Sequence, residues 1–87
     1  MMTAQDQRSL HVVVLQMLRA KRDLGRLEDA LLNDARMQGH ELTLAQLEGE
    51  LRLLGDKNWI APMELPLTGK RWRITALGES ILTEAKL

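Results

Sequence analysis

The sequence contains no cysteine, no phenylalanine and no tyrosine among its 87 residues. Without cysteine the chain can form neither a disulfide nor a thiolate metal site, and its composition fits a reducing compartment. Trp59 and Trp72 are the only aromatic side chains, so the core has to be built mainly from aliphatic residues. A leucine-rich composition of this kind favours helices over an all-β fold.

Long apolar runs are also missing. No stretch approaches the ~20 residues of a membrane span, and the first residues show no basic region followed by an apolar segment. We therefore expect a cytoplasmic protein that makes no membrane contact. Twelve basic and twelve acidic residues give a formal net charge of zero. Because dedicated nucleic-acid binders are usually basic overall, this balance counts mildly against one.

The length of the chain fits a single domain. Residues 1–7 are polar and have no period, which predicts a flexible N-terminus before one domain over residues 8–87. Between Arg8 and Lys21 the apolar residues recur at i, i+3, i+4, i+7 and i+8, which predicts a helix with Ser9 as its N-cap. The residues of this stripe are Leu10, Val13, Val14, Met17 and Leu18.

A break follows over residues 22–26, where Gly25 permits a turn. The next apolar residues recur at i, i+4 and i+8, which predicts a second helix over about residues 27–38. Gly39 stands where the left-handed residue after a helix belongs. The short break over residues 22–26 therefore connects the first two helices.

The third helix has the clearest start, because Thr43 and Gln46 have the spacing of a capping box. Leucines then follow at i, i+3, i+7 and i+10, and Gly55 ends the run. This pattern predicts a helix with one buried face. The leucines are Leu44, Leu47, Leu51 and Leu54.

The periodicity changes after the third helix. Residues 59–63 are short, apolar and contain a proline, which predicts an edge strand. Residues 71–75 alternate polar and apolar side chains, as in a half-buried strand. Pro66 and Gly69 bracket a turn over residues 64–70. The two strands therefore form a hairpin.

A last helix is predicted over residues 77–87, with Thr75 as its cap and with Leu77, Ile81 and Ala85 on its inner face. The predicted fold class is mainly α with a small β-hairpin. It is a winged helix-turn-helix of three helices, a two-stranded wing and a C-terminal helix. In this arrangement the third helix is the one that enters a major groove.

The segment LAQLEGELRLLGDKNWI, followed by a wing and by WRITALGESIL, resembles winged-helix domains of bacterial regulators. In these domains an R-x-x-LT-x-x-G segment closes the wing, and RWRITALG (residues 71–78) takes its place here. The layout over about residues 8–85 also resembles small winged-helix proteins encoded in Mu-like prophages. The resemblance implies a phage or bacterial transcriptional regulator. This chain departs from the regulators in having an acidic third helix.

Catalytic chemistry finds little support. His11 and His40 are the only histidines, and neither has the spacing of a metal motif. The six glycines are isolated from one another, so there is no glycine-rich phosphate loop. Ser9 and Ser80 have no neighbouring base. We therefore expect no enzyme, no cofactor and no metal.

Basic residues gather on the predicted wing, where they would lie along a phosphate backbone or enter a minor groove. The alternative is a solvated edge strand, whose charges discourage pairing with other sheets. Trp72 alternates with these residues and is expected in the core. On the third helix, Gln46 and Arg52 have side chains that read bases. The candidate residues for binding double-stranded DNA are Gln46, Arg52, Lys70, Arg71 and Arg73.

The third helix also carries the main objection to DNA binding. From His40 to Asp56 four acidic residues stand against Arg52 alone, and carboxylates oppose the phosphate attraction that supplies much of the affinity. Glu48 and Glu50 are expected to be exposed. Gly49 costs about 1 kcal/mol relative to alanine, and it marks either a tolerated exposed position or close approach by another surface. The alternative function is a protein–protein interaction module of a phage or bacterial assembly, whose acidic third helix docks an unidentified partner.

The first helix is apolar on more than one side, because Val12 and Leu15 lie off its main stripe. Such a helix is either fully covered or part of an interface. Either the last helix or a second copy of the chain covers these residues. The second case predicts a homodimer through the first helix and the C-terminal helix.

Overall fold

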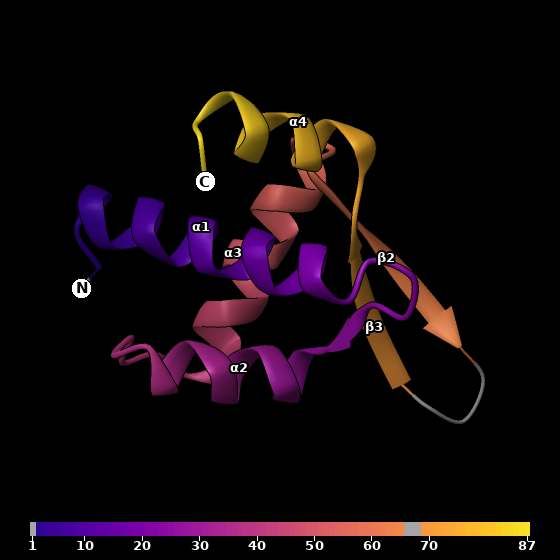
Figure 1. Cartoon of the computed structure of the whole chain (residues 1–87). Coiled ribbons are helices and arrows are strands. Elements are labelled where there is room, and N and C mark those ends of the chain that lie inside the picture. The colour runs from indigo at the N-terminus through magenta and orange to yellow at the C-terminus, as the bar shows by residue number, and fades with distance from the viewer. Residues whose placement is uncertain (1, 66–68) are drawn as a thin grey trace.

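The computed structural model describes residues 2–65 and 69–87. Figure 1 shows three helices packed together, a hairpin that projects from one side, and both chain ends on the other side. None of the described helices is long and apolar enough to cross a membrane. The order of elements is α1 (Ala4–Ala20), β1 (Arg26–Leu27), α2 (Glu28–Met37), α3 (Leu44–Asp56), β2 (Ile60–Leu65), β3 (Gly69–Ile74) and α4 (Ala76–Glu84).

The predicted fold class is confirmed: three helices are followed by the β2–β3 hairpin, which is the wing, and by a C-terminal helix. Part of the predicted turn over residues 64–70, including Pro66, lies outside the described residues. The sheet also contains β1, which the sequence did not predict because two residues show no period. All pairings are antiparallel in the order β1-β3-β2, with Arg26 opposite Trp72. This topology is consistent with a winged-helix arrangement.

Gly25 explains how β1 reaches the hairpin. Its φ of +68° is a left-handed conformation that side chains rarely adopt, and a Cβ atom there would lie 2.6 Å from the carbonyl oxygen of Trp72. Glycine therefore satisfies both the conformation and the close approach. The turn expected at Gly25 is confirmed, and it brings the chain alongside β3.

The core is aliphatic, as the composition predicts, and every helix contributes to it. Trp72 is 5% exposed, which confirms its expected place in the core. Gly55 lets this ring lie against α3, since a Cβ atom at Gly55 would be 3.3 Å from the ring. The residues with no exposed surface are Leu10, Val14, Leu18, Leu31, Ala35, Leu47, Leu51 and Leu54.

The start of α1 differs from the prediction. The helix begins at Ala4, because Thr3 and Asp6 form a capping box in which the Asp6 N–H donates to Thr3 Oγ1 at 3.0 Å. The N-cap predicted at Ser9 is therefore wrong, and the helix starts inside the segment 1–7. The capping spacing was overlooked because residues before Arg8 have no apolar period.

The turn between α2 and α3 follows the prediction closely. Gly39 has a φ of +93°, which confirms its role after the second helix. The Arg36 side chain then fastens the turn, since Nη2 donates to the carbonyl oxygen of Leu42 at 3.0 Å. The turn is held to α2 by this contact, and it sets the direction in which α3 begins.

The end of α3 corrects two expectations. The helix continues to Asp56 instead of ending at Gly55, and Asn58 with a φ of +63° makes the turn. Trp59 was expected under the wing, but it lines a groove with residues of α1 and α4. The reason is that β2 begins only at Ile60, so that Trp59 precedes the hairpin.

The cap of α4 is confirmed, since the Gly78 N–H donates to Thr75 Oγ1 at 3.1 Å. The predicted inner face is wrong: Leu77 is 48% exposed, whereas Gly78 and Leu82 are buried. A Cβ atom at Gly78 would lie 2.2 Å from the carbonyl oxygen of Trp59. The helix therefore turns its glycine to the protein, a choice that apolar periodicity does not reveal.

The second apolar side of α1 consists of Val12 and Leu15, and these two residues are buried to different extents. Helix α4 packs against α1, and Leu15 is only 2% exposed. Val12 is half-buried. Both residues line the same groove as Trp59. The homodimer through α1 and α4 stays a prediction.

Candidate nucleic-acid interface

Helix α3 is the element that a winged-helix domain presents to DNA. A capping box stabilises its N-terminal end. The capping box is confirmed in both directions: the Gln46 N–H donates to Thr43 Oγ1 at 3.2 Å, and the Thr43 N–H donates to Gln46 Oε1 at 2.8 Å. The fully buried Leu47 and Leu51 face the core. This orientation decides which residues point outward.

The outward face of α3 carries two small residues and two charged ones. Ala45, Gly49, Arg52 and Asp56 are exposed along it, at spacings that place them on one side of a helix. A Cβ atom added at Gly49 would have no neighbour within 4 Å. Since two of the four residues are small, another surface can approach the helix backbone closely here, with Arg52 between the small residues and the acidic end.

Gln46 lies away from this outward face. It is exposed, but its Oε1 atom accepts the capping hydrogen bond, which leaves Nε2 as the atom to donate to a ligand. Its side chain lines pockets formed with the α2–α3 turn, including His40 and Leu42. The structure therefore separates Gln46 from Arg52, although both were predicted on one DNA-reading surface.

Glu50 differs most from its predicted position. Its side chain is only 18% exposed and contacts α1. Glu50 Oε2 lies 2.6 Å from Nε2 of His11, and the Gln7 side-chain amide donates to Glu50 Oε1 at 3.1 Å and to Oε2 at 3.0 Å. The expected exposure of Glu50 is wrong because a residue two positions from Glu48 lies about 200° around the helix. His11 becomes a packing residue that joins two helices.

The ionisation of Glu50 follows from these contacts. Burial raises the pKa of the carboxyl group, but the hydrogen bonds from Gln7 and His11 and the electrostatic attraction of His11 and Lys57 outweigh it. The pKa therefore lies below its ordinary value. Glu50 is a charged, committed partner of α1 and does not contribute its charge to the outward face of α3.

The expected exposure of Glu48 is also wrong, since this residue is half-buried, and it lies in a crevice between α3 and the wing. The crevice has a volume of about 160 Å³ and is lined by Glu28, Glu48, Arg52, Lys70 and Trp72. Trp72 Nε1 donates to Glu28 Oε1 at 2.9 Å, and Lys70 Nζ lies 5.2 Å from the centre of the Trp72 ring. Two carboxylates thus stand beside two cations, and the crevice has no excess of positive charge.

The wing divides the remaining candidates. Lys70 shares a face of β3 with the buried Trp72, so it lies on the side of α3. Arg71 and Arg73 alternate to the opposite face, where Arg73 is exposed and Arg71 is half-buried beside Met63 on β2. Of the five predicted site residues, the structure brings Arg52 and Lys70 together, and it places the other three elsewhere.

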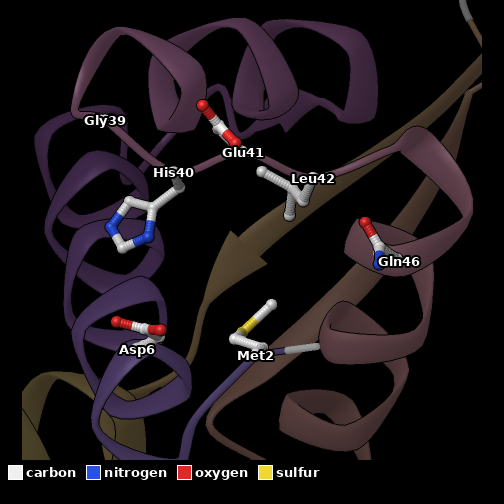
Figure 2. Close-up of a pocket in the computed structure, with 7 residues that line it drawn as sticks. All are labelled: Met2, Asp6, Gly39, His40, Glu41, Leu42 and Gln46. Atoms are coloured by element: carbon white, nitrogen blue, oxygen red, sulfur yellow. The ribbon is translucent and has the colours of Figure 1, made fainter.

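A further pocket lies at the N-terminal end of α3, with a volume of about 330 Å³. Figure 2 shows His40 and Asp6 on one flank of it and Gln46 on the other, with Met2 at its base. No local pattern indicates this pocket, because Asp6 and His40 are distant along the chain. Its carboxylates make it a poor cradle for phosphate.

Metal-assisted chemistry has no visible basis in the part of the chain that the structure describes. Within residues 2–65 and 69–87, no three histidine, aspartate or glutamate side chains are grouped so that they could hold a metal ion. His11 and Glu50 form a pair with an amide as third member. This pair serves to connect α1 with α3.

No protein-family model matches the chain, and no curated protein or solved structure matches it either. The assignment of the fold therefore rests on the order and pairing of its own elements. They define a small domain of helices with one small antiparallel sheet in the order β1-β3-β2. What the domain binds has to be argued from its surfaces.

Proposed function

We propose that this chain binds double-stranded DNA through the outward face of α3 and the adjoining face of the wing. The observation that carries the proposal is the inward turn of Glu50 towards His11. It removes one of the acidic side chains that oppose an approach to phosphates. What is left outward is a low surface of Ala45 and Gly49 with the cation Arg52 beside them.

The proposed contacts follow from the reach of each side chain. Small residues at the centre of a recognition helix permit the backbone to enter a major groove deeply, where Arg52 meets base edges or phosphate. Lys70 lies on the same side and meets the neighbouring phosphates. Arg71 and Arg73 contribute only if the DNA also passes the outer face of the wing.

The affinity is expected to be modest and only weakly dependent on salt. Glu48 and Asp56 remain near the proposed surface, and they offset part of the attraction that Arg52 and Lys70 provide. Few phosphate contacts also mean a shallow dependence of the binding constant on salt concentration. This behaviour would differ from that of a strongly basic DNA-binding domain.

The biological setting in this proposal comes from the resemblance of RWRITALG (residues 71–78) and of the whole layout to winged-helix domains of bacterial regulators and Mu-like prophages. It implies a phage or bacterial transcriptional regulator that acts in the cytoplasm. The alternative, docking of a protein through an acidic α3, depended on Glu48 and Glu50 being exposed together. It is weakened because Glu50 contacts α1.

The experiment is a titration of fluorescently labelled random-sequence duplex, followed by anisotropy at several salt concentrations. We expect binding at low salt, and we expect the double variant R52A/K70A to bind more weakly with a salt slope reduced by about two contacts' worth. Arg8→Ala is the matched control, because Arg8 is an exposed cation of α1 outside the proposed face. It should change neither affinity nor slope.

Two outcomes would count against the proposal. Wild-type protein that shows no binding up to about 100 μM at low salt falls below even non-specific DNA affinity. Equal losses in R52A/K70A and in Arg8→Ala would mean that the measured binding is diffuse charge attraction and does not use α3. A slope lowered instead by R71A/R73A would move the contact to the outer face of the wing.

A further inference from the structure

A second surface is the apolar groove between α1 and α4. It has a volume of about 430 Å³, and the C-terminal end of α3 closes it from below. Its apolar lining is drawn from four parts of the chain, which are far apart in sequence. Its larger apolar residues include Val12, Leu15, Leu53, Trp59 and Ile81.

The groove is partly open to solvent although its lining is apolar. Leu53 is 37% exposed, and Val12, Trp59 and Ile81 are half-buried. Contiguous exposed apolar surface on a small domain marks an interaction site more often than scattered single residues do. Leu77, in contrast, is 48% exposed but does not line the groove.

The charged residues of the groove favour an acidic ligand. Arg8 and Lys57 line it, and Lys57 Nζ lies 4.7 Å from the centre of the Trp59 ring. No acidic side chain is among its lining residues in the described chain. The carboxylate of Glu50 is held by Gln7 and His11, which line the groove, whereas Glu50 itself does not.

We infer that the groove docks an amphipathic helical segment of a partner protein that carries apolar anchors flanked by acidic residues. A groove between two helices with an apolar floor receives the apolar face of a third helix, which is read at i, i+3, i+4 and i+7. Carboxylates at the edges of that helix pair with Arg8 and Lys57. The inference does not depend on DNA binding, because none of its residues belongs to the outward face of α3.

A second copy of this chain fits the groove less well. A two-fold contact brings the same patch of both copies together. Each patch contributes the cations Arg8 and Lys57 and no acidic side chain, so a two-fold contact brings like charges together where a foreign acidic helix is attracted. The homodimer through α1 and α4 is therefore retained as an outcome of the test.

The probe is a phage-displayed library of random peptides, selected against the immobilised full chain. We expect the enriched peptides to combine helically spaced leucine-like anchors with aspartate or glutamate. Synthetic versions should lose at least about tenfold in affinity for Leu53→Ser and for the charge-reversal variant R8E/K57E. Leu77→Ser is the matched control, since it removes an exposed leucine outside the groove, and Arg52→Ala tests independence from the DNA face. Both should bind as the wild type does.

The charge-reversal variant keeps the test decisive if Leu53→Ser is poorly folded, because Arg8 and Lys57 are both exposed, and circular dichroism checks that the loss of the Lys57–Trp59 contact leaves the fold intact. Failure to enrich any peptide, enrichment of basic peptides, or unchanged binding to R8E/K57E would each overturn the inference. So would a wild-type dimer in sedimentation velocity that Leu53→Ser dissociates, because a second copy would then occupy the groove.

Discussion

Glu48 and Glu50 lie two residues apart on α3, yet they belong to two different regions of the molecule. Glu48 lines the crevice beside the wing with Arg52 and Lys70, whereas Glu50 is bonded to His11 and Gln7 of α1. The wing side is polar, open and balanced in charge. The α1 side is packed and continues into an apolar groove. Counting charges along a helix therefore does not give the charge of its surface.

The same comparison explains why one helix can serve two surfaces. Positions two apart on a helix differ by about 200° in direction, so neighbouring residues face different partners. On one side α3 offers small residues and a cation, and on the other it closes a groove with Leu53. The two proposed binding surfaces thus share a helix but not their residues.

The largest effect is expected on stability, at the buried residues of α3 that lie beneath both proposed surfaces. Leu47→Ala or Leu51→Ala should lower the free energy of unfolding by about 2–5 kcal/mol, because each side chain is fully buried. Urea denaturation followed by circular dichroism measures it. Leu53→Ala on the same helix is the control and should cost less, as this side chain is partly exposed. An equal loss of unfolding free energy at all three positions would show that Leu47 and Leu51 do not form a buried face distinct from Leu53.

Two glycines test the contrast between packed and open surfaces. Gly78→Ala should destabilise the fold by about 1–3 kcal/mol, since the new Cβ atom would collide with the carbonyl oxygen of Trp59. Gly49→Ala should stabilise it by about 1 kcal/mol, because the position is helical and open. Thermal melting of both variants gives the two signs. If Gly49→Ala also weakens DNA binding, close approach at Gly49 is supported.

The α1 side should respond to acid in a way that the wing side does not. Because the pKa of Glu50 is lower in the folded chain than its ordinary value of 4.5, the charged group stabilises the fold above that pH, and the contribution is lost as the pH falls through the lowered pKa. At neutral pH, Glu50→Gln should cost about 1–2 kcal/mol, because hydrogen bonds to a charged group contribute about 1.5–3 kcal/mol and the amide keeps part of the bonding.

The control for this prediction is Glu48→Gln, which should change stability by less than about 0.5 kcal/mol. Denaturant titrations between neutral and acidic pH should show a flatter decline for Glu50→Gln than for the wild type. Parallel curves for the wild type and both variants would mean that Glu50 is not specifically stabilised by His11 and Gln7.

The smallest effect is expected on DNA affinity, and it should differ between variants of Glu48 and of Glu50. Glu48→Gln should raise the affinity for random duplex at low salt by up to about fivefold, the equivalent of an exposed charge interaction of about 0.2–1 kcal/mol. Glu50→Gln should leave it unchanged, as this carboxylate faces α1. Anisotropy titrations compare the two. A larger gain for Glu50→Gln would show that the DNA contacts lie on the α1 side.

The candidate site could be predicted from the sequence only in part. Arg52 and Lys70 were named as site residues, but nothing local indicates that they share a crevice with Trp72. Gln46 was predicted both as a capping residue and as a base reader, and its cap uses the oxygen that the second role needs. Val12 and Leu15 indicated a second apolar side of the first helix and an interface with the C-terminal helix, but the part that Leu53 and Trp59 take in the α1–α4 groove was not predicted.

The sequence by itself determined the helices, their caps and the alternation of the wing. These features depend on residues within about four positions of one another, as at Thr43 with Gln46 and at Thr75 with Gly78. Tertiary structure alone decided what each surface carries. His11 and Glu50 are 39 positions apart, and β1 exists only because Gly25 lets two residues reach β3. A local pattern specifies direction along a helix or strand, whereas the partner that a side chain meets depends on how the elements pack.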